Sequence, residues 1–272
     1  MPRVDSTARV ADGARLADDV EIGPYCVIGP QVEIGPAARL LSHVNLSGVT
    51  AIGARTVIYP FASLGTPPQS TAYRGGDTRL VVGSDCQIRE GVTISTGSET
   101  GGGTTMVGDR CFLMANSHVA HDCAVGNDVT FANGAVLGGH VKIADNAFIG
   151  GNTAVLQFVR VGEGAMLGGM SGITRDVIPF GFAFGPKADL VGINVVGLKR
   201  RGYSRDDIRR VRRAYSTLFI GQGTLAARTE SATAQFAGDP VIAKILSFIR
   251  EGESRPLMTP AAGQQADPNE AS

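Results

Sequence analysis

The sequence has no tryptophan, only five tyrosines and no net charge, since 25 basic residues balance 25 acidic ones. A neutral chain is not expected to coat nucleic acid, because that binding depends on an excess of basic side chains. No apolar run approaches the ~20 residues that span a bilayer, and the N-terminus lacks a basic and then apolar leader. These absences predict a cytoplasmic protein with no nucleic-acid partner and no stable membrane insertion.

Glycine, in contrast, is abundant, with 37 residues in a chain of 272. This is about twice the ~7 % of ordinary proteins. The glycines do not recur at every third position and there are only 13 prolines, which excludes collagen. Because 43 % of the residues are hydrophobic, most of the chain is expected to fold rather than remain disordered.

A period of six residues explains the glycine content. In steps of six from Val4 to Leu64, every position is aliphatic, and the pattern returns at Val82–Ile94 and, after a shift of phase, at Val107–Ile173. Glycine often follows this position, and a small residue stands four places after it. Neither a helix nor a simple alternating strand has this period. The pattern indicates short strands joined by tight corners, which glycine suits because it tolerates a positive φ.

The repeat resembles that of the hexapeptide-repeat family. The resemblance implies a mainly β fold, a left-handed parallel β-helix with three strands per 18-residue coil, and the length gives about ten coils. We predict this solenoid over residues 1–190, with loops ejected at 66–79 and 95–105. Long loops on a rigid scaffold often carry function. The run Gly101–Gly102–Gly103 in the second loop lacks the Lys-Ser/Thr of a phosphate-binding loop and precedes a strand, which argues against that use.

Beyond residue 190 the period is lost, and a C-terminal α-helical domain is predicted over 191–252. Ser204 with Asp207 forms a capping box, Thr224 is a second cap, and Asp239 followed by Pro240 starts a third helix. The proline-rich segment 253–272 is predicted to be a disordered tail.

The four cysteines all occupy the small inward position of the repeat: Cys26, Cys86, Cys111 and Cys123. Reduced core thiols are favoured over the alternatives, metal ligands or disulfides. This agrees with a reducing compartment.

The repeat also predicts which distant residues meet. Residues 18 apart lie in one column about 4.8 Å apart, so His121, Gly139 and Gln157 should cluster at one corner, with His140 beside them. Asp122 could orient the His121 ring, and the Gly139 N–H could donate to a developing oxyanion. A general base, its orienting carboxylate and an oxyanion donor suit acyl transfer. His118, His121 and His140 lack the spacing of zinc-dependent hexapeptide enzymes, so no metal is predicted, and His43 is expected to be structural.

Charge divides along the predicted domain boundary. Residues 1–191 hold 13 basic and 17 acidic side chains, a net of −4, whereas residues 192–272 hold 12 and 8, a net of +4. Eight of the basic residues fall between Lys199 and Arg213. Arg205, Arg209, Arg212 and Arg213 are spaced to share a helix face. This face is either simply solvated or a dock for an acidic partner or a phosphorylated ligand.

Longer motifs give a more specific resemblance. The stretches Asn116–Cys123, Gly138–Val141, Ala154–Phe158 and Asn194–Gly202 are similar to those of the UDP-N-acetylglucosamine O-acyltransferases, which catalyse the first step of lipid A biosynthesis. The resemblance implies a homotrimer with active sites between subunits. It also implies transfer of a 3-hydroxyacyl chain from acyl carrier protein to the sugar 3-hydroxyl, with no cofactor beyond the phosphopantetheine of the carrier.

Site residues follow from this resemblance residue by residue. His121 matches the general base, Asp122 its partner and Gly139 the oxyanion donor. The expected substrate contacts are His118, His140, Gln157, Asn194, Gln69, Arg200 and Arg201. Gly169 matches a position that limits the length of the acyl groove. The expected residues of the carrier-protein dock are Lys199, Arg205, Arg209 and Arg212.

The sequence also departs from the family pattern. Leu156 and Ser95 stand where the family often has histidine, and Ala72 where it has lysine, while nearby Arg74 could replace the missing positive charge. These changes leave open whether the acceptor is the 3-hydroxyl or a 3-amino sugar. Two other readings are a related sugar-nucleotide acyltransferase on the same scaffold and a non-catalytic β-solenoid.

Overall fold

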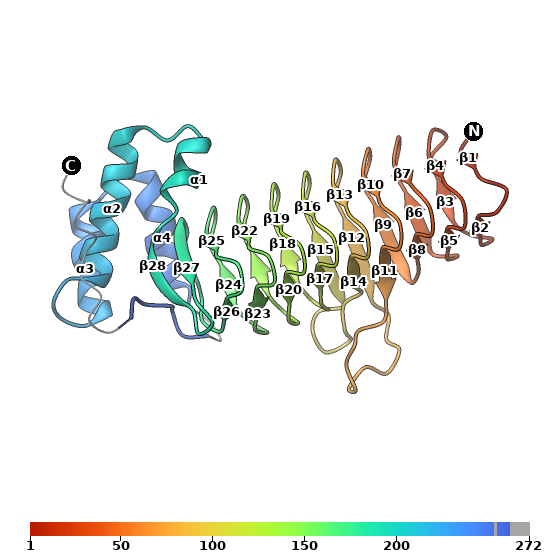
Figure 1. Ribbon diagram of the computed structural model, residues 1–272. Coiled ribbons are helices and arrows are strands. Elements are labelled where there is room, and N and C mark those ends of the chain that lie inside the picture. Colours follow the sequence, from red (N-terminus) through yellow and green to blue (C-terminus); the bar gives the residue numbers. More distant parts are fainter. Residues whose placement is uncertain (253–254, 262–272) are drawn as a thin grey trace.

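The six-residue repeat folds into a long stack of coils with helices at one end (Figure 1). This is a computed structural model, and it describes residues 1–252 and 255–261. Three strands per coil form three flat sheets, which we call A, B and C in the order in which the chain visits them. Each coil therefore has an A–B, a B–C and a C–A corner.

Sheet A contains β1 (Arg3–Val4), β4 (Glu21–Ile22), β7 (Arg39–Leu40), β10 (Val57–Ile58), β13 (Gln87–Ile88), β16 (Phe112–Leu113), β19 (Thr130–Phe131), β22 (Phe148–Ile149), β25 (Met166–Leu167), β27 (Gly181–Phe184) and β28 (Asp189–Ile193). Sheet B contains β2 (Arg9–Val10), β5 (Val27–Ile28), β8 (Asn45–Leu46), β11 (Ser63–Thr66), β14 (Thr93–Ser95), β17 (His118–Val119), β20 (Val136–Leu137), β23 (Ala154–Val155) and β26 (Gly172–Ile173). Sheet C contains β3 (Arg15–Leu16), β6 (Val32–Ile34), β9 (Val49–Ile52), β12 (Arg79–Val82), β15 (Thr104–Val107), β18 (Ala124–Val125), β21 (Lys142–Ile143) and β24 (Arg160–Val161).

Strands of successive coils pair in parallel with a shift of 18 residues, as between His118 and Val136. Two longer connections leave the stack between β11 and β12 and between β14 and β15, and both project from the same side of the solenoid (Figure 1). Both connect sheet B to sheet C, so both lie at the B–C corner. The two loops therefore lie at the same corner of the solenoid as His121.

The glycines have two purposes. At the corner itself, Gly13, Gly91, Gly134 and Gly164 have a positive φ, as predicted, whereas the glycines that directly follow the aliphatic position serve another purpose. Of the twelve that follow the repeated aliphatic position, Gly65 alone has a positive φ, whereas sixteen non-glycine corner residues, among them Asp122 and His140, do adopt one. A Cβ on Gly23 would lie 2.0 Å from the Leu41 carbonyl oxygen in the next coil, and one on Gly150 would lie 2.5 Å from the Gly169 nitrogen. Glycine is needed there because adjacent coils stack too closely for any side chain.

The inward residues of all three sheets form one continuous core. The repeated large positions such as Leu64, Ile94 and Phe131 are fully buried. All four cysteines are free and buried, as predicted, and burial raises the pKa of Cys123 to about 12. His43 stacks between Tyr25 and Phe61 at the A–B corner, with ring centroids 5.0 Å apart.

Four helices follow the solenoid: α1 (Val195–Arg200), α2 (Arg205–Phe219), α3 (Leu225–Gln235) and α4 (Pro240–Arg250). The predicted caps are present, because Ser204 and Asp207 form a capping box, Thr224 caps α3 and Asp239 caps α4. The short helix α1, capped by Asn194, was not predicted. Among the helices of the described part, none combines the length and apolarity needed to cross a bilayer.

The predicted limits of the two parts differ from the structure. The limit at residue 190 falls inside β28, because the solenoid ends in an antiparallel hairpin of β27 and β28. Residues 255–261, predicted to be disordered, run back along the solenoid, and Met258 is buried and donates its amide to the Asp176 carbonyl. The remaining residues of the predicted tail lie outside the described residues. A buried ion pair of Arg160 and Asp176 (2.7 Å) secures this junction, where the Arg160 guanidinium also lies over Phe248.

Candidate active site

The candidate active site lies at the B–C corner, where the turns after β17, β20 and β23 carry His121, Gly139 and Gln157. The structure thus brings together the column that the 18-residue spacing predicted. The His121 ring lies directly over Gly139, because a Cβ at that position would be 2.6 Å from His121 Cε1. Within the described residues, the Gly139 amide N–H has no hydrogen-bond partner.

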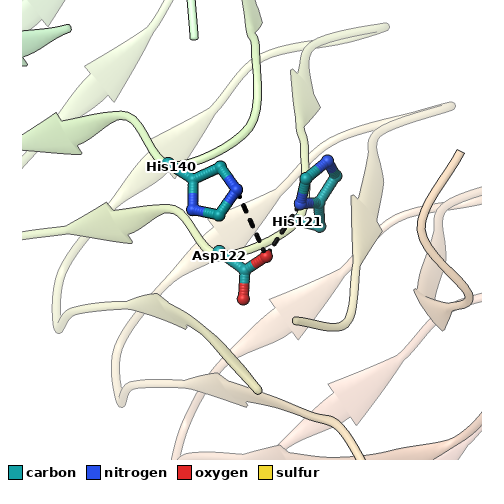
Figure 2. Close-up of side chains that lie close together, drawn as sticks. All are labelled: His121, Asp122 and His140. Carbon is teal, nitrogen blue, oxygen red and sulfur yellow. Dashed lines mark hydrogen bonds and ion pairs between the residues drawn. The ribbon is translucent and has the colours of Figure 1, made fainter. Parts of the chain in front are cut away.

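His121 and Asp122 form a hydrogen-bonded pair. Nδ1 of His121 lies 2.8 Å from Oδ2 of Asp122, and His140 Nε2 approaches the same oxygen at 3.8 Å (Figure 2). A carboxylate partner assigns the proton to Nδ1, which leaves the lone pair of Nε2 directed away from Asp122. In this tautomer His121 can accept a proton from a substrate hydroxyl.

Asp122 is enclosed, with only 1 % of its side chain exposed. Burial raises the pKa of this carboxyl, but hydrogen bonds from the Ser98 hydroxyl, the His121 ring and the Ser98 amide outweigh it, so the pKa lies below the ordinary value of 3.8. Asp122 is therefore an anion at neutral pH and can stabilise a protonated His121.

The two other histidines of the site are held neutral. Burial lowers the pKa of His118 and that of His140 below 6.5. His118 lies on β17 and its Nδ1 is 2.7 Å from the Thr93 hydroxyl. The His140 ring stacks on Phe158, with centroids 4.5 Å apart, and meets His121 edge to face. Neutral rings in fixed orientations suit hydrogen bonding to a substrate.

His121, Asp122 and His140 also offer ligand atoms within 4.8 Å of one another, a spacing at which they could share a metal ion. The Asp122 oxygen nearest both rings already accepts hydrogen bonds from Ser98 and His121. This arrangement suits an acid–base pair better than an open ligand set.

An apolar groove adjoins the histidines. A cavity of about 470 Å³ runs along the outer face of sheet B beside the B–C corner. It is lined by His118, Val136, Leu137, Gly138, Gly139, Ala154, Val155, Leu156, Gln157, Gly172, Ile173 and Thr174. Leu156 is 42 % exposed and adds to the apolar lining. The groove can accept a hydrocarbon chain with its head near His121.

Other predicted site residues lie elsewhere on the single chain. Gly169 is at the A–B corner, on the opposite edge of sheet B from His121. Asn194 donates to the Gly164 carbonyl at the C–A corner, and the Arg201 guanidinium lies over Phe180 at that corner. Both terminal nitrogens of Arg201 are buried and lack hydrogen-bond partners among the described residues. Burial lowers the pKa of Arg201 below its ordinary value.

In the loop between β11 and β12, Gln69 and Ala72 are exposed. The Arg74 guanidinium is exposed and donates to the carbonyl oxygens of Thr71 and Tyr73. Ser95 is buried, with 2 % of its surface exposed.

The basic residues line a second cavity, of about 730 Å³, along α2. Its basic lining residues are Lys199, Arg205, Arg209, Arg212 and Arg213, which include all four residues of the predicted dock. Arg200 is exposed next to it. Arg210 points elsewhere and joins α2 to the cap of α4 through Asp239.

The 18-residue spacing does not predict three neighbours of the site. Ser98 donates to Asp122, Gly101 packs against Asp122 and His140, and Nε of Arg255 donates to the Gln157 carbonyl oxygen at 3.1 Å. Ser98 and Gly101 lie in a loop without the repeat, and Arg255 returns from a segment 98 residues away, so no spacing rule relates them to the column.

Comparisons with known proteins agree with this geometry. The family described as "Udp N-acetylglucosamine O-acyltransferase; Domain 2" matches residues 176–258, and "Bacterial transferase hexapeptide (six repeats)" matches residues 104–139. The acyl-(acyl-carrier-protein)–UDP-N-acetylglucosamine O-acyltransferase of Azorhizobium caulinodans is 56 % identical over 260 residues, which is 96 % of each chain.

Solved structures are similar over nearly the whole length. LpxA from Acinetobacter baumannii has a TM-score of 0.90 at 36 % identity, covering 93 % of this chain and 99 % of that one. UDP-N-acetylglucosamine acyltransferase from Campylobacter jejuni has a TM-score of 0.90 at 34 % identity, covering 95 % and 100 %. The predicted left-handed parallel β-helix with a C-terminal helical region is confirmed.

Proposed function

Since this chain belongs to the UDP-N-acetylglucosamine O-acyltransferase family, we propose that His121 is the general base with which it acylates the sugar. The protein is an acyltransferase that uses acyl carrier protein as donor and UDP-N-acetylglucosamine as acceptor, in the first step of lipid A biosynthesis. The observation that carries the proposed role is the His121 ring, oriented by Asp122 at 2.8 Å and lying over the free amide of Gly139.

The reaction uses these groups in order. His121 Nε2 removes the proton of the sugar hydroxyl, whose oxygen attacks the thioester carbonyl of the donor. The Gly139 N–H stabilises the resulting oxyanion, and Asp122 stabilises the imidazolium. Collapse of the intermediate breaks the carbon–sulfur bond, and the leaving thiolate takes the proton from His121. No cofactor of the protein's own is needed, because the acyl group arrives activated on the phosphopantetheine of the carrier.

Binding follows from the two cavities. The groove along sheet B takes the acyl chain, a 3-hydroxyacyl group, and His118, His140 and Gln157 contact the substrate at its head. The acidic carrier protein docks on the basic cavity of Lys199, Arg205, Arg209 and Arg212.

Assembly as a homotrimer completes the site. Within one chain, His121, Gly169 and Arg201 lie at three different corners of the solenoid. Copies arranged around a threefold axis place the C–A or A–B corner of one chain against the B–C corner of the next. Asn194, Arg200 and Arg201 then reach the sugar nucleotide, Gln69 contacts it from its loop, and Gly169 leaves space for a longer acyl chain. The four free thiols suit work in the reducing cytoplasm.

Acyl transfer by the purified protein tests this proposal. The donors are 3-hydroxyacyl carrier proteins of several chain lengths, and the acceptors are UDP-N-acetylglucosamine and its 3-amino analogue. We expect transfer to the 3-hydroxyl and a decrease of about 10²–10⁴-fold in kcat for His121→Ala. The control is His43→Ala, since His43 lies far from the site. The proposal fails if neither acceptor is acylated, and His121 is not the base if His121→Ala stays within a few-fold of wild type.

A further inference from the structure

The loop between β14 (Thr93–Ser95) and β15 (Thr104–Val107) encloses the Asp122 carboxylate. Proton transfer to His121 creates an imidazolium, which Asp122 can stabilise only if its carboxylate stays ionised and keeps one oxygen directed at Nδ1. Side chains rotate readily about their terminal bond, so an aspartate next to a base needs contacts that fix its plane. The loop supplies these contacts.

Ser98 makes two hydrogen bonds to Asp122, one to each carboxylate oxygen. Its amide N–H donates to Oδ1 at 2.9 Å, and its hydroxyl donates to Oδ2 at 2.5 Å. Oδ2 is also the oxygen that accepts from His121 Nδ1. Ser98 is itself buried, with 6 % of its surface exposed. Two donors from one residue, on both oxygens, fix the carboxylate plane in the orientation that His121 requires.

Gly101 allows the loop to come this close. A Cβ on Gly101 would lie 2.2 Å from Asp122 Oδ2 and 2.4 Å from His140 Cε1. Any side chain at this position would therefore displace Asp122 or His140. Of the three consecutive glycines, Gly101 is the one that the close packing of the loop on Asp122 and His140 requires.

The loop between β11 and β12 contacts the loop that contains Ser98. The carboxylate of Glu99 accepts a hydrogen bond from the Arg74 amide at 2.7 Å. In the buried space between the loops, the Thr78 hydroxyl donates to the Thr96 hydroxyl at 3.1 Å. These contacts flank Ser98 in the sequence and tie its loop to the loop after β11 (Ser63–Thr66).

We propose that Ser98 is a positioning residue for acyl transfer, holding the Asp122 carboxylate ionised and directed at His121. The inference rests on the proposed function, since it assigns Ser98 to the same reaction. Hydrogen bonds to an ionised acceptor are about twice as strong as those between neutral groups. We therefore expect loss of the Ser98 hydroxyl to weaken the stabilisation of protonated His121 by Asp122.

Steady-state kinetics of Ser98 variants test this role. Ser98→Ala is expected to lower kcat about tenfold and to leave the KM of UDP-N-acetylglucosamine within about twofold, because Ser98 does not touch substrate. Thr100→Ala is the matched control, an exposed hydroxyl in the same loop, and should behave as wild type. Ser98→Thr and Ser98→Val have the same shape and differ in the hydroxyl alone, so Thr should retain more activity than Val.

The pH dependence of kcat distinguishes a positioning role of Ser98 from a purely structural one, because a structural role would not shift it. Among the described residues, the titratable groups that face Asp122 are His121 and His140. The Ser98 hydroxyl helps to lower the Asp122 pKa against burial, which raises it. The acid limb of kcat should therefore move to higher pH in Ser98→Ala.

A folded Ser98→Ala protein, checked by its unfolding temperature, with wild-type kcat and acid limb would overturn the inference. So would equal activities of the Thr and Val variants. A wild-type chain that transfers no acyl group to either acceptor would instead overturn the proposed function, and this inference with it.

Discussion

At the scale of single residues, burial of imidazole rings at the B–C corner makes the stability of the protein depend on pH. The pKa values of His118 and His140 are lowered by burial in the folded state. The unfolded chain binds these protons more readily, so stability falls as the pH drops below about 6.5 and continues to fall towards the lower folded values. The stabilisation from Asp122, whose pKa is also lowered, is present above 3.8 and is lost as the pH falls from there through the folded value.

His118→Gln tests this dependence. We expect the unfolding temperature of the wild type to fall between pH 7 and pH 5.5, and the variant to show a smaller fall because one buried imidazole is removed. Thermal unfolding followed by circular dichroism at both pH values measures the difference. His43→Gln, at the exposed A–B corner, is the control. An equal fall in wild type and His118→Gln would contradict the assignment.

At the scale of elements, α2 combines a buried and a basic face. Ile208, Val211, Tyr215 and Leu218 are buried, as their spacing predicts. The opposite side carries the arginines that line the basic cavity. Because exposed charges steer acidic partners mainly by long-range attraction, this face should affect binding of the carrier protein and not the chemical step.

Charge reversal on α2 tests the dock. Arg205→Glu with Arg209→Glu is expected to raise the KM of the carrier-bound donor about tenfold at low salt, with less effect at high salt because ions screen exposed charges. The KM of UDP-N-acetylglucosamine and the rate with an acyl-pantetheine donor should not change. Arg9→Glu, on β2 at the far end of the solenoid, is the control. If donor KM is unchanged at low salt, the carrier does not dock on this face.

Sequence patterns predict these elements unequally well. The caps at Ser204, Thr224 and Asp239 predict the starts of α2, α3 and α4, because each side chain accepts hydrogen bonds from backbone amides only a few residues away. Helix α1 has six residues and contains Gly197, so it carries no helical period. Its start depends on Asn194, whose side chain is held by the Gly164 carbonyl of the solenoid.

At the scale of the whole molecule, the triangular cross-section separates the predicted site residues among three corners. One chain alone therefore does not bring His121 together with Arg201. A cyclic trimer would join the B–C corner of one copy to another corner of the next, and each site would take its base from one chain and its arginine from another.

Mixed trimers test this sharing. His121→Ala and Arg201→Ala chains, each expected to be inactive alone, are co-expressed with different tags and purified in two steps. Because every mixed cyclic trimer keeps one intact site of three, activity should return to about one third of wild type. Analytical ultracentrifugation confirms the oligomer. Inactive mixed trimers, made from folded inactive parents, would contradict a shared site.

The repeat in the sequence predicts the solenoid, its columns and the meeting of His121, Gly139 and Gln157, because a strict 18-residue coil turns spacing into position. It also predicts that Asp122 lies beside His121, because the two residues are consecutive in one corner turn. Packing in three dimensions determines the close stacking of coils that requires glycine directly after the aliphatic position, and it determines how Ser98 and Gly101 enclose Asp122. It also decided that residues 255–261 return to the solenoid and bring Arg255 against Gln157. These contacts join segments outside the repeat, whose approach depends on packing in three dimensions and leaves no period in the chain.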